Sequence, residues 1–149
     1  KMVNRELVIS SLIQHQEQVI QDFETLVARY KSAVDADNED TQDIEDLSRQ
    51  DVASEMMHSM ELQLVQAQHD LNTLKTMDMR VTETVTQGSI VATENYKFFI
   101  AIANHGFKVG DEEYIGLAPD APIYSFMRGK KAGDSFSFNK KDYTIKSIY

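Results

Sequence analysis

The sequence contains no cysteine, which excludes a disulfide framework, a thiolate nucleophile and a cysteine-based metal site. Such a composition suits a reducing compartment. Nowhere does the sequence approach the roughly 18 consecutive apolar residues of a membrane-spanning helix. Residues 1–15 hold no sustained apolar run, so we expect no signal peptide. The sequence therefore predicts a cytoplasmic protein that has no membrane partner.

Glycine and proline are also scarce, and all 6 glycines and both prolines lie after residue 87. Without these residues the first part of the chain can form long uninterrupted helices, whereas their presence later marks turns. The length of 149 residues favours one or two small domains. We therefore expect a helical N-terminal part and a turn-rich C-terminal part.

Basic residues are few in the first half of the chain. Residues 1–80 carry 7 Lys/Arg against 16 Asp/Glu, whereas residues 81–149 carry 8 of each. Within residues 35–46 (DADNEDTQDIED) seven of twelve side chains are carboxylates and none is basic. Such a block repels the phosphates of free nucleic acid and attracts cations or basic protein surfaces. We therefore expect no direct, sequence-specific DNA binding.

Two apolar heptad patterns predict helices at about residues 4–34 and 49–78. The first seam contains one polar member and consists of Leu12, Gln16, Val19, Phe23, Leu26, Tyr30 and Ala33, widened by Ile13, Ile20, Val27 and Val34. The second seam consists of Ala53, Met57, Met60, Leu64, Ala67, Leu71 and Leu74. Joined by a polar connector, the two segments predict an antiparallel coiled-coil hairpin over residues 1–80, with an acidic tip at residues 35–51.

From about residue 81 the apolar pattern changes to the period of strands. We expect strands at residues 90–93, 96–103, 113–117, 135–138 and 143–149, and a short amphipathic helix at residues 123–127. The sequence thus predicts an α+β protein in which the helical hairpin is followed by a small antiparallel β-sheet domain at residues 81–149.

This layout resembles the bacterial Gre transcript-cleavage factors, in which a coiled-coil finger precedes a domain of FKBP-like fold. Residues 88–91 (GSIV) are similar to the start of the family's first strand, and Gly133 and Asp134 to its Gly-Asp turn. Residues 120–130 are similar to a family loop that docks on RNA polymerase, with one extra residue before its Gly-Lys pair. The resemblance implies docking through Asp120, Ala121, Pro122, Gly129 and Lys130. Because residues 81–149 carry no net charge, we expect this half to dock mainly by itself.

The resemblance extends to the acidic tip. Family members that stimulate cleavage carry Asp-Leu-x-Glu followed by Asn-Ala-Glu-Tyr. Residues 43–46 (DIED) keep the first acid, an apolar neighbour and an acid three residues on, whereas residues 47–50 read LSRQ. The resemblance implies that Asp43 and Asp46, with Asp40 and Glu45 in reserve, are the catalytic carboxylates. They would hold a Mg²⁺ ion shared with RNA polymerase, so no cofactor is expected in the isolated protein.

By this resemblance the protein is an accessory factor and not an enzyme. It would insert its tip into the secondary channel of RNA polymerase and stimulate cleavage of backtracked RNA, meeting the RNA 3′ end through the polymerase. Carboxylates suit this role because Mg²⁺ prefers oxygen ligands and two metal ions stabilise a phosphodiester displacement. One alternative is a regulator of the same shape that occupies the channel without promoting cleavage. A remote alternative is an FKBP-like prolyl isomerase or chaperone with an aromatic pocket, for which the candidates are Tyr96, Phe98, Phe99, Phe126, Phe136 and Phe138.

Overall fold

The computed structural model describes residues 3–37 and 44–149, without the side chains of residues 34, 36, 37 and 44–50. The chain forms two compact units. The helical unit consists of Gln16–Leu71, and the sheet unit combines Lys1–His15 with Asn72–Tyr149. In the part of the chain that is described, none of the helices is both long and apolar enough to cross a membrane.

Both predicted helices are present, and both extend further toward the acidic tip than expected. Helix α1 spans Arg5–Asp37 and helix α2 spans Ile44–Thr76, each 33 residues long. No glycine or proline interrupts the sequence between residues 34 and 49, so no residue there forces a helix to end. The connector between the helices is therefore shorter than the heptad patterns indicated.

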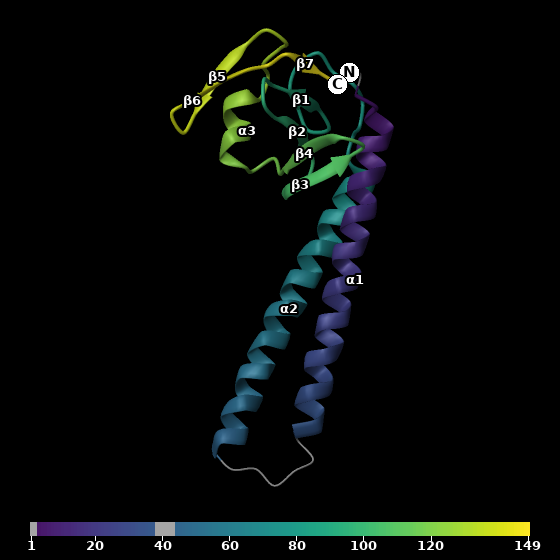
Figure 1. Cartoon of the computed structure of the whole chain (residues 1–149), viewed down its shortest axis with the longest axis vertical. Helices are drawn as coiled ribbons and strands as arrows, with labels where there is room; N and C mark the ends of the chain where they lie inside the picture. The colour runs from purple at the N-terminus through teal and green to yellow at the C-terminus, as the bar shows by residue number, and fades with distance from the viewer. Residues whose placement is uncertain (1–2, 38–43) are drawn as a thin grey trace. The chain divides into compact units, whose positions relative to one another are not determined.

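In the helical unit, α1 and α2 run antiparallel beside each other (Figure 1). The predicted seam is confirmed at its described positions, which are buried or half-buried, with the exception of Ala33, which is exposed. Within this unit the buried members are Gln16, Ile20 and Ala67, and the seam members Leu12 and Leu74, which belong to the sheet unit, are buried as well. The Gln16 side chain crosses the seam, and its Nε2 donates a hydrogen bond to the main-chain oxygen of Ala67 at 2.9 Å. The one polar member of the seam is thus satisfied by the opposite helix.

The sheet unit contains a five-stranded sheet in the order β3-β4-β2-β1-β7 and a separate β5–β6 pair. The strands are β1 (Ile90–Ala92), β2 (Lys97–Ile100), β3 (Asn104–Val109), β4 (Glu112–Leu117), β5 (Ser135–Phe138), β6 (Lys141–Thr144) and β7 (Ser147–Ile148). The short helix α3 spans Pro122–Met127, close to the predicted segment. The architecture is α+β, a long helical hairpin followed by a mainly antiparallel sheet domain with one short helix, as the sequence predicts.

Three details of the sheet differ from the prediction. Strand β2 pairs with β4 in parallel, because the β3–β4 hairpin folds back so that β4 inserts beside β2. The expected strand at residues 96–103 ends at Ile100, and a separate strand, β3, follows it. The expected strand at residues 143–149 changes partner at the fully buried Ile145, from β5 to β1. These pairings depend on distant partners, which local apolar periodicity does not specify.

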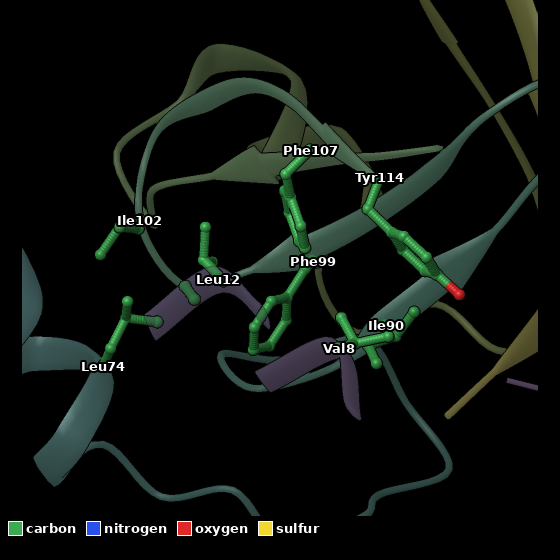
Figure 2. Close-up of a cluster of buried hydrophobic side chains, with 9 residues drawn as sticks. Val8, Leu12, Leu74, Ile90, Phe99, Ile102, Phe107 and Tyr114 are labelled. Atoms are coloured by element: carbon green, nitrogen blue, oxygen red, sulfur yellow. The ribbon is translucent and has the colours of Figure 1, made fainter. Parts of the chain in front are cut away.

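Hydrophobic side chains cover both faces of the five-stranded sheet. On one face Val8 and Leu12 of α1 and Leu74 of α2 pack with Phe99 (Figure 2). On the other face the core contains Val85, Val91, Phe98, Ile100, Tyr124, Met127, Phe136 and Ile145. Adjacent residues of β2 therefore point into different cores, which is why this strand is a continuous apolar run.

The ends of both long helices belong to the core of the sheet unit. Val8, Leu12 and Leu74 are 0–2% exposed and complete the cluster around Phe99. Strand periodicity predicts a domain that begins at residue 81. The compact unit instead includes residues 1–15 and 72–80.

Candidate functional site

An open cleft of about 690 Å³ lies in the sheet unit, beside the first three predicted docking residues. One wall is the loop that contains Asp120, Ala121 and Pro122. The remaining lining comes from the sheet and its connections, at Ala103, Asn104, His105, Ile115, Gly116, Leu117 and Ala118. Most of these side chains are apolar, with Asp120, Asn104 and His105 as the polar members. The cleft therefore suits an apolar group that carries polar or basic atoms at its edge.

The docking loop is shaped by its own backbone and by the helix that follows. Pro122 is the first residue of α3, where its missing N–H costs nothing. Ala121 caps the helix without a side-chain hydrogen bond, but its N–H donates to the Ala118 oxygen at 2.9 Å. The buried Tyr124 and Met127 anchor α3 in the core. Asp120 and Pro122 are thereby left exposed on a loop with fixed ends.

The opposite wall of the cleft depends on Gly116 in β4. A Cβ atom at this position would overlap the main-chain oxygen of Ile102 and lie 2.9 Å from the Asn104 Cβ. The glycine therefore allows β4 to approach the segment that enters β3. The docking prediction did not include this wall. A glycine inside a strand pattern, which often marks a close backbone approach, was the available signal.

The other two predicted docking residues lie beyond the far end of α3. Gly129 and Lys130 follow the helix, and neither lines the cleft. Their backbone pairs with Val85: the Gly129 N–H donates to the Val85 oxygen at 2.9 Å, and the Val85 N–H donates to the Lys130 oxygen at 2.8 Å. Gly129 adopts a φ of +80°, which favours glycine. The predicted docking residues are thus divided between the two ends of α3.

The predicted metal-binding carboxylates are not described at the level of side chains. Asp40 and Asp43 lie outside the described residues, and Glu45 and Asp46 belong to the first turn of α2 by their backbone alone. Among the side chains that the structure does describe, no group of three or more His, Asp or Glu residues could hold a metal ion. The assignment of Asp43 and Asp46 therefore stays a prediction.

The six aromatic residues considered for an isomerase pocket do not form one cluster. Phe99 lies in the core on the α1 side of the sheet, whereas Phe98 and Phe136 are buried in the core on the α3 side. Phe126 is 50% exposed and packs on Phe138, with ring centroids 5.7 Å apart. Most of these rings are thus used in packing, and the cleft beside Asp120 is lined by none of them.

Comparison with known proteins finds solved structures that are similar to this chain. No protein-family model and no curated protein matches it. One similar structure is that of the transcription factor Gfh1, at 15% identity and a TM-score of 0.36, covering 93% of this chain and 94% of that chain. Another is GreA factor homolog 1 (Gfh1) of Thermus thermophilus, at 12% identity and a TM-score of 0.36, covering 95% of this chain and 92% of that chain.

Proposed function

We propose that the chain is an accessory factor of RNA polymerase that presents an acidic helical hairpin to the catalytic centre and stimulates cleavage of backtracked RNA. The observation that carries the proposal is the division of charge between the two compact units. The helical unit, Gln16–Leu71, holds 14 Asp/Glu and 3 Lys/Arg, whereas the sheet unit holds 10 and 12. The excess negative charge is therefore confined to the hairpin and concentrated where α1 ends and α2 begins.

The extent of the helices supports a role for this acidic segment. Helix α1 continues to Asp37 and α2 begins at Ile44, so helical backbone reaches both sides of residues 38–43. A rigid helical pair is a suitable support for a group that must be delivered into a narrow channel, because it needs no other domain to hold it. Asp43 and Asp46, with Asp40 and Glu45 in reserve, are the proposed metal ligands.

The donor set fits Mg²⁺ in a shared site only. Carboxylate oxygens are the ligands that Mg²⁺ prefers, but two carboxylates leave most of its six coordination positions to water or to a partner. When bound between factor and polymerase, the ion would help to stabilise the charge that develops on the displaced phosphodiester. The chain's own part is to supply the oxygens and to orient them, which makes it an accessory factor and not an enzyme.

Docking is assigned to the sheet unit. Asp120 and Pro122 are exposed at the rim of the cleft, and Ala121 is half-buried beside them. An apolar side chain of the polymerase would enter the cleft, while Asp120 accepts hydrogen bonds from a basic neighbour. This unit carries a small positive net charge, so an acidic surface does not repel it as it would repel the acidic helical hairpin.

A second candidate is a regulator that occupies the channel without stimulating cleavage. The observation in its favour is the sequence of the tip, where Asp46 replaces the longer Glu of the cleavage-factor pattern and residues 47–50 read LSRQ. Since Asp is shorter than Glu by one methylene, its oxygens reach less far toward a second metal ion.

A backtracked elongation complex of the cognate polymerase, supplied with Mg²⁺ and this protein, tests the proposal. A cleavage factor releases short 3′ RNA fragments, and Asp43→Asn should abolish this release while leaving binding to polymerase intact. Asp22→Asn provides the control, because Asp22 is an exposed carboxylate of α1 whose partner is Gln18. Binding with inhibited synthesis and no fragments would identify the regulator instead. Absence of any binding to polymerase would refute both functions.

A further inference from the structure

The β5–β6 hairpin carries its aromatic and basic side chains on one face. Phe136 pairs with Tyr143 and Phe138 pairs with Lys141 across the two strands. These four residues share a face because alternate residues of a strand point the same way. On the opposite face Ser137 donates a hydrogen bond to Asp142. The two faces of the hairpin are therefore chemically distinct.

The aromatic face continues onto neighbouring elements. The buried Phe136 stacks on Tyr143, with centroids 5.0 Å apart and an angle of 8° between the rings. Tyr96 lies 6.2 Å from Tyr143, and Phe126 of α3 lies 5.7 Å from Phe138. We call Tyr96, Phe126, Phe138 and Tyr143 the aromatic surface. Phe126 is exposed, and the other three members are half-buried.

Lys141 places a positive charge against this surface. Its Nζ lies 4.6 Å from the centroid of the Tyr96 ring and 5.7 Å from that of Tyr143. It also donates a hydrogen bond to the Tyr96 hydroxyl at 3.0 Å, which raises the pKa of Lys141. The ammonium group is therefore held in place and remains charged at neutral pH.

More positive charge gathers in the same segment of an otherwise acidic protein. Residues 126–141 contain five basic residues and one acid, Asp134. The Asp134 carboxylate accepts a hydrogen bond from the Lys131 N–H at 2.8 Å and so stabilises the turn between these two residues. The basic residues are Arg128, Lys130, Lys131, Lys140 and Lys141. The local excess of positive charge contrasts with a net charge of −9 for the whole chain.

The turn of the hairpin holds one of these cations in an unfavourable backbone conformation. Asn139 and Lys140 have φ angles of +52° and +63°. A two-residue hairpin turn of this kind favours Asn at the first position and Gly at the second. Lysine at the second position carries the cost of a left-handed conformation that glycine would avoid. Lys140 therefore occupies a position at which glycine would be less strained.

We propose that the aromatic surface and the cations around it bind single-stranded nucleic acid without sequence preference. Bases would stack on the partly exposed rings of Phe126 and Phe138, while Lys140, Lys141 and Arg128 contact phosphates. Exposed aromatic rings beside basic side chains are the combination that single-strand-binding proteins use. An acidic peptide would satisfy the cations but leaves the rings without planar partners. A proline-rich peptide would use the rings but has no need of the cations.

The acidic helical unit confines this binding to one place. The helical unit holds 14 carboxylates against 3 basic residues and therefore repels phosphates. Single-stranded nucleic acid should accordingly bind the sheet unit and not the helical unit. Binding of RNA to the protein can be measured without polymerase. A negative result in that binding measurement therefore leaves the outcome of the cleavage assay unaffected, and the reverse also holds.

Fluorescence anisotropy with a labelled single-stranded oligouridine RNA and the full chain tests the proposal. Phe126→Ala should weaken binding about 5- to 150-fold, as expected for the loss of one base–aromatic stack. Phe126→Trp should retain binding, because the ring is restored. Lys140→Gln should reduce the slope of log K against log salt by about 0.7, whereas Lys108→Gln, the same change at an exposed position of β3, should leave the slope unchanged.

Lys140→Gly separates function from folding. Glycine relieves the left-handed conformation at this position, so the variant should unfold at a higher temperature and yet bind RNA more weakly. RNA affinity that is unchanged in both Phe126→Ala and Lys140→Gly would overturn the proposal. A labelled polyglutamate peptide that binds more tightly than RNA, with the same dependence on Lys140, would reassign the surface to an acidic protein partner. Absence of RNA binding by the unmodified chain at low salt would also refute it.

Discussion

The guanidinium of Arg5 donates a hydrogen bond to the main-chain oxygen of Tyr149 at 2.9 Å. A second donation, to the Met79 oxygen at 2.6 Å, ties the same side chain to the segment that follows α2. Three parts of the sheet unit that are distant in sequence therefore meet at one half-buried side chain. The Tyr149 oxygen also accepts a hydrogen bond from the Ile90 N–H at 3.0 Å, which places β1 in the same network.

Replacing this arginine should destabilise the sheet unit. Arg5→Met keeps the apolar stem but removes both donors, and we expect the free energy of unfolding to fall by about 2 kcal/mol. Urea unfolding followed by tyrosine fluorescence measures the change. Arg80→Met is the control, since the Arg80–Asp78 ion pair is exposed to solvent and should contribute little. Equal effects of the two substitutions would contradict the role given to Arg5.

The contribution of the buried Gln16 side chain to stability should depend more on its shape than on its polar amide. We expect Gln16→Ala to lower the unfolding free energy of the helical unit by about 1–2 kcal/mol, because a buried side chain and its bond to Ala67 are lost. Gln16→Leu should be neutral or stabilising, since main-chain oxygens inside a helix already accept a helical hydrogen bond. Thermal unfolding followed by circular dichroism distinguishes the two. A Leu variant less stable than the Ala variant would show that the amide itself is essential.

The close backbone approach at Gly116 should not tolerate a side chain. Gly116→Ala places a Cβ against the Ile102 oxygen, and we expect destabilisation of about 1–3 kcal/mol together with a distorted cleft. Gly110→Ala meets no atom within 4 Å and bears only the strain of its positive φ, so it should cost about 1 kcal/mol. Chemical denaturation compares the two variants. Normal stability of Gly116→Ala would mean that β4 can move away from residue 102.

A fragment that begins at residue 81, which the sequence alone predicts to dock by itself, should fail to fold without residues 1–15 and 72–80 of the sheet unit. It lacks Val8, Leu12 and Leu74, which are at most 2% exposed in the intact chain, and each buried side chain of this kind contributes about 1.5–3 kcal/mol. Amide signal dispersion in a nuclear magnetic resonance spectrum reports the outcome. A chain in which residues 16–71 are replaced by a flexible linker retains all three side chains and should fold. A well-dispersed spectrum from the shorter fragment would show that the strands alone hold the core.

The helices and the seam were predictable because their signal is local. Leu12, Gln16 and Ile20 recur at helical spacing, and the absence of glycine and proline allows the pattern to continue without interruption. The same reasoning placed the ends of both helices too far from the tip. The charged residues there provide no apolar pattern from which a helix can be predicted. The acidic character of residues 35–46 was also explicit, although their role as metal ligands depends on a resemblance and stays a prediction.

The sheet required information from distant parts of the chain. Nothing near β4 specifies that it pairs in parallel with β2, or that Ile145 ends one pairing and begins another. The cleft beside Asp120 has a wall at Gly116 that only the folded backbone brings to it. Its sequence signal was a single glycine inside a strand.

The sequence by itself determined the α+β order, the two helical seams and the confinement of the excess negative charge to the first half of the chain. These properties follow from composition and from spacings of three and four residues. Tertiary structure alone decided that Val8 and Leu74 complete the sheet core, that Phe126 meets Phe138, and that Asp120 borders a cleft. Those relationships join residues far apart in the chain, and packing against a common sheet brings them together.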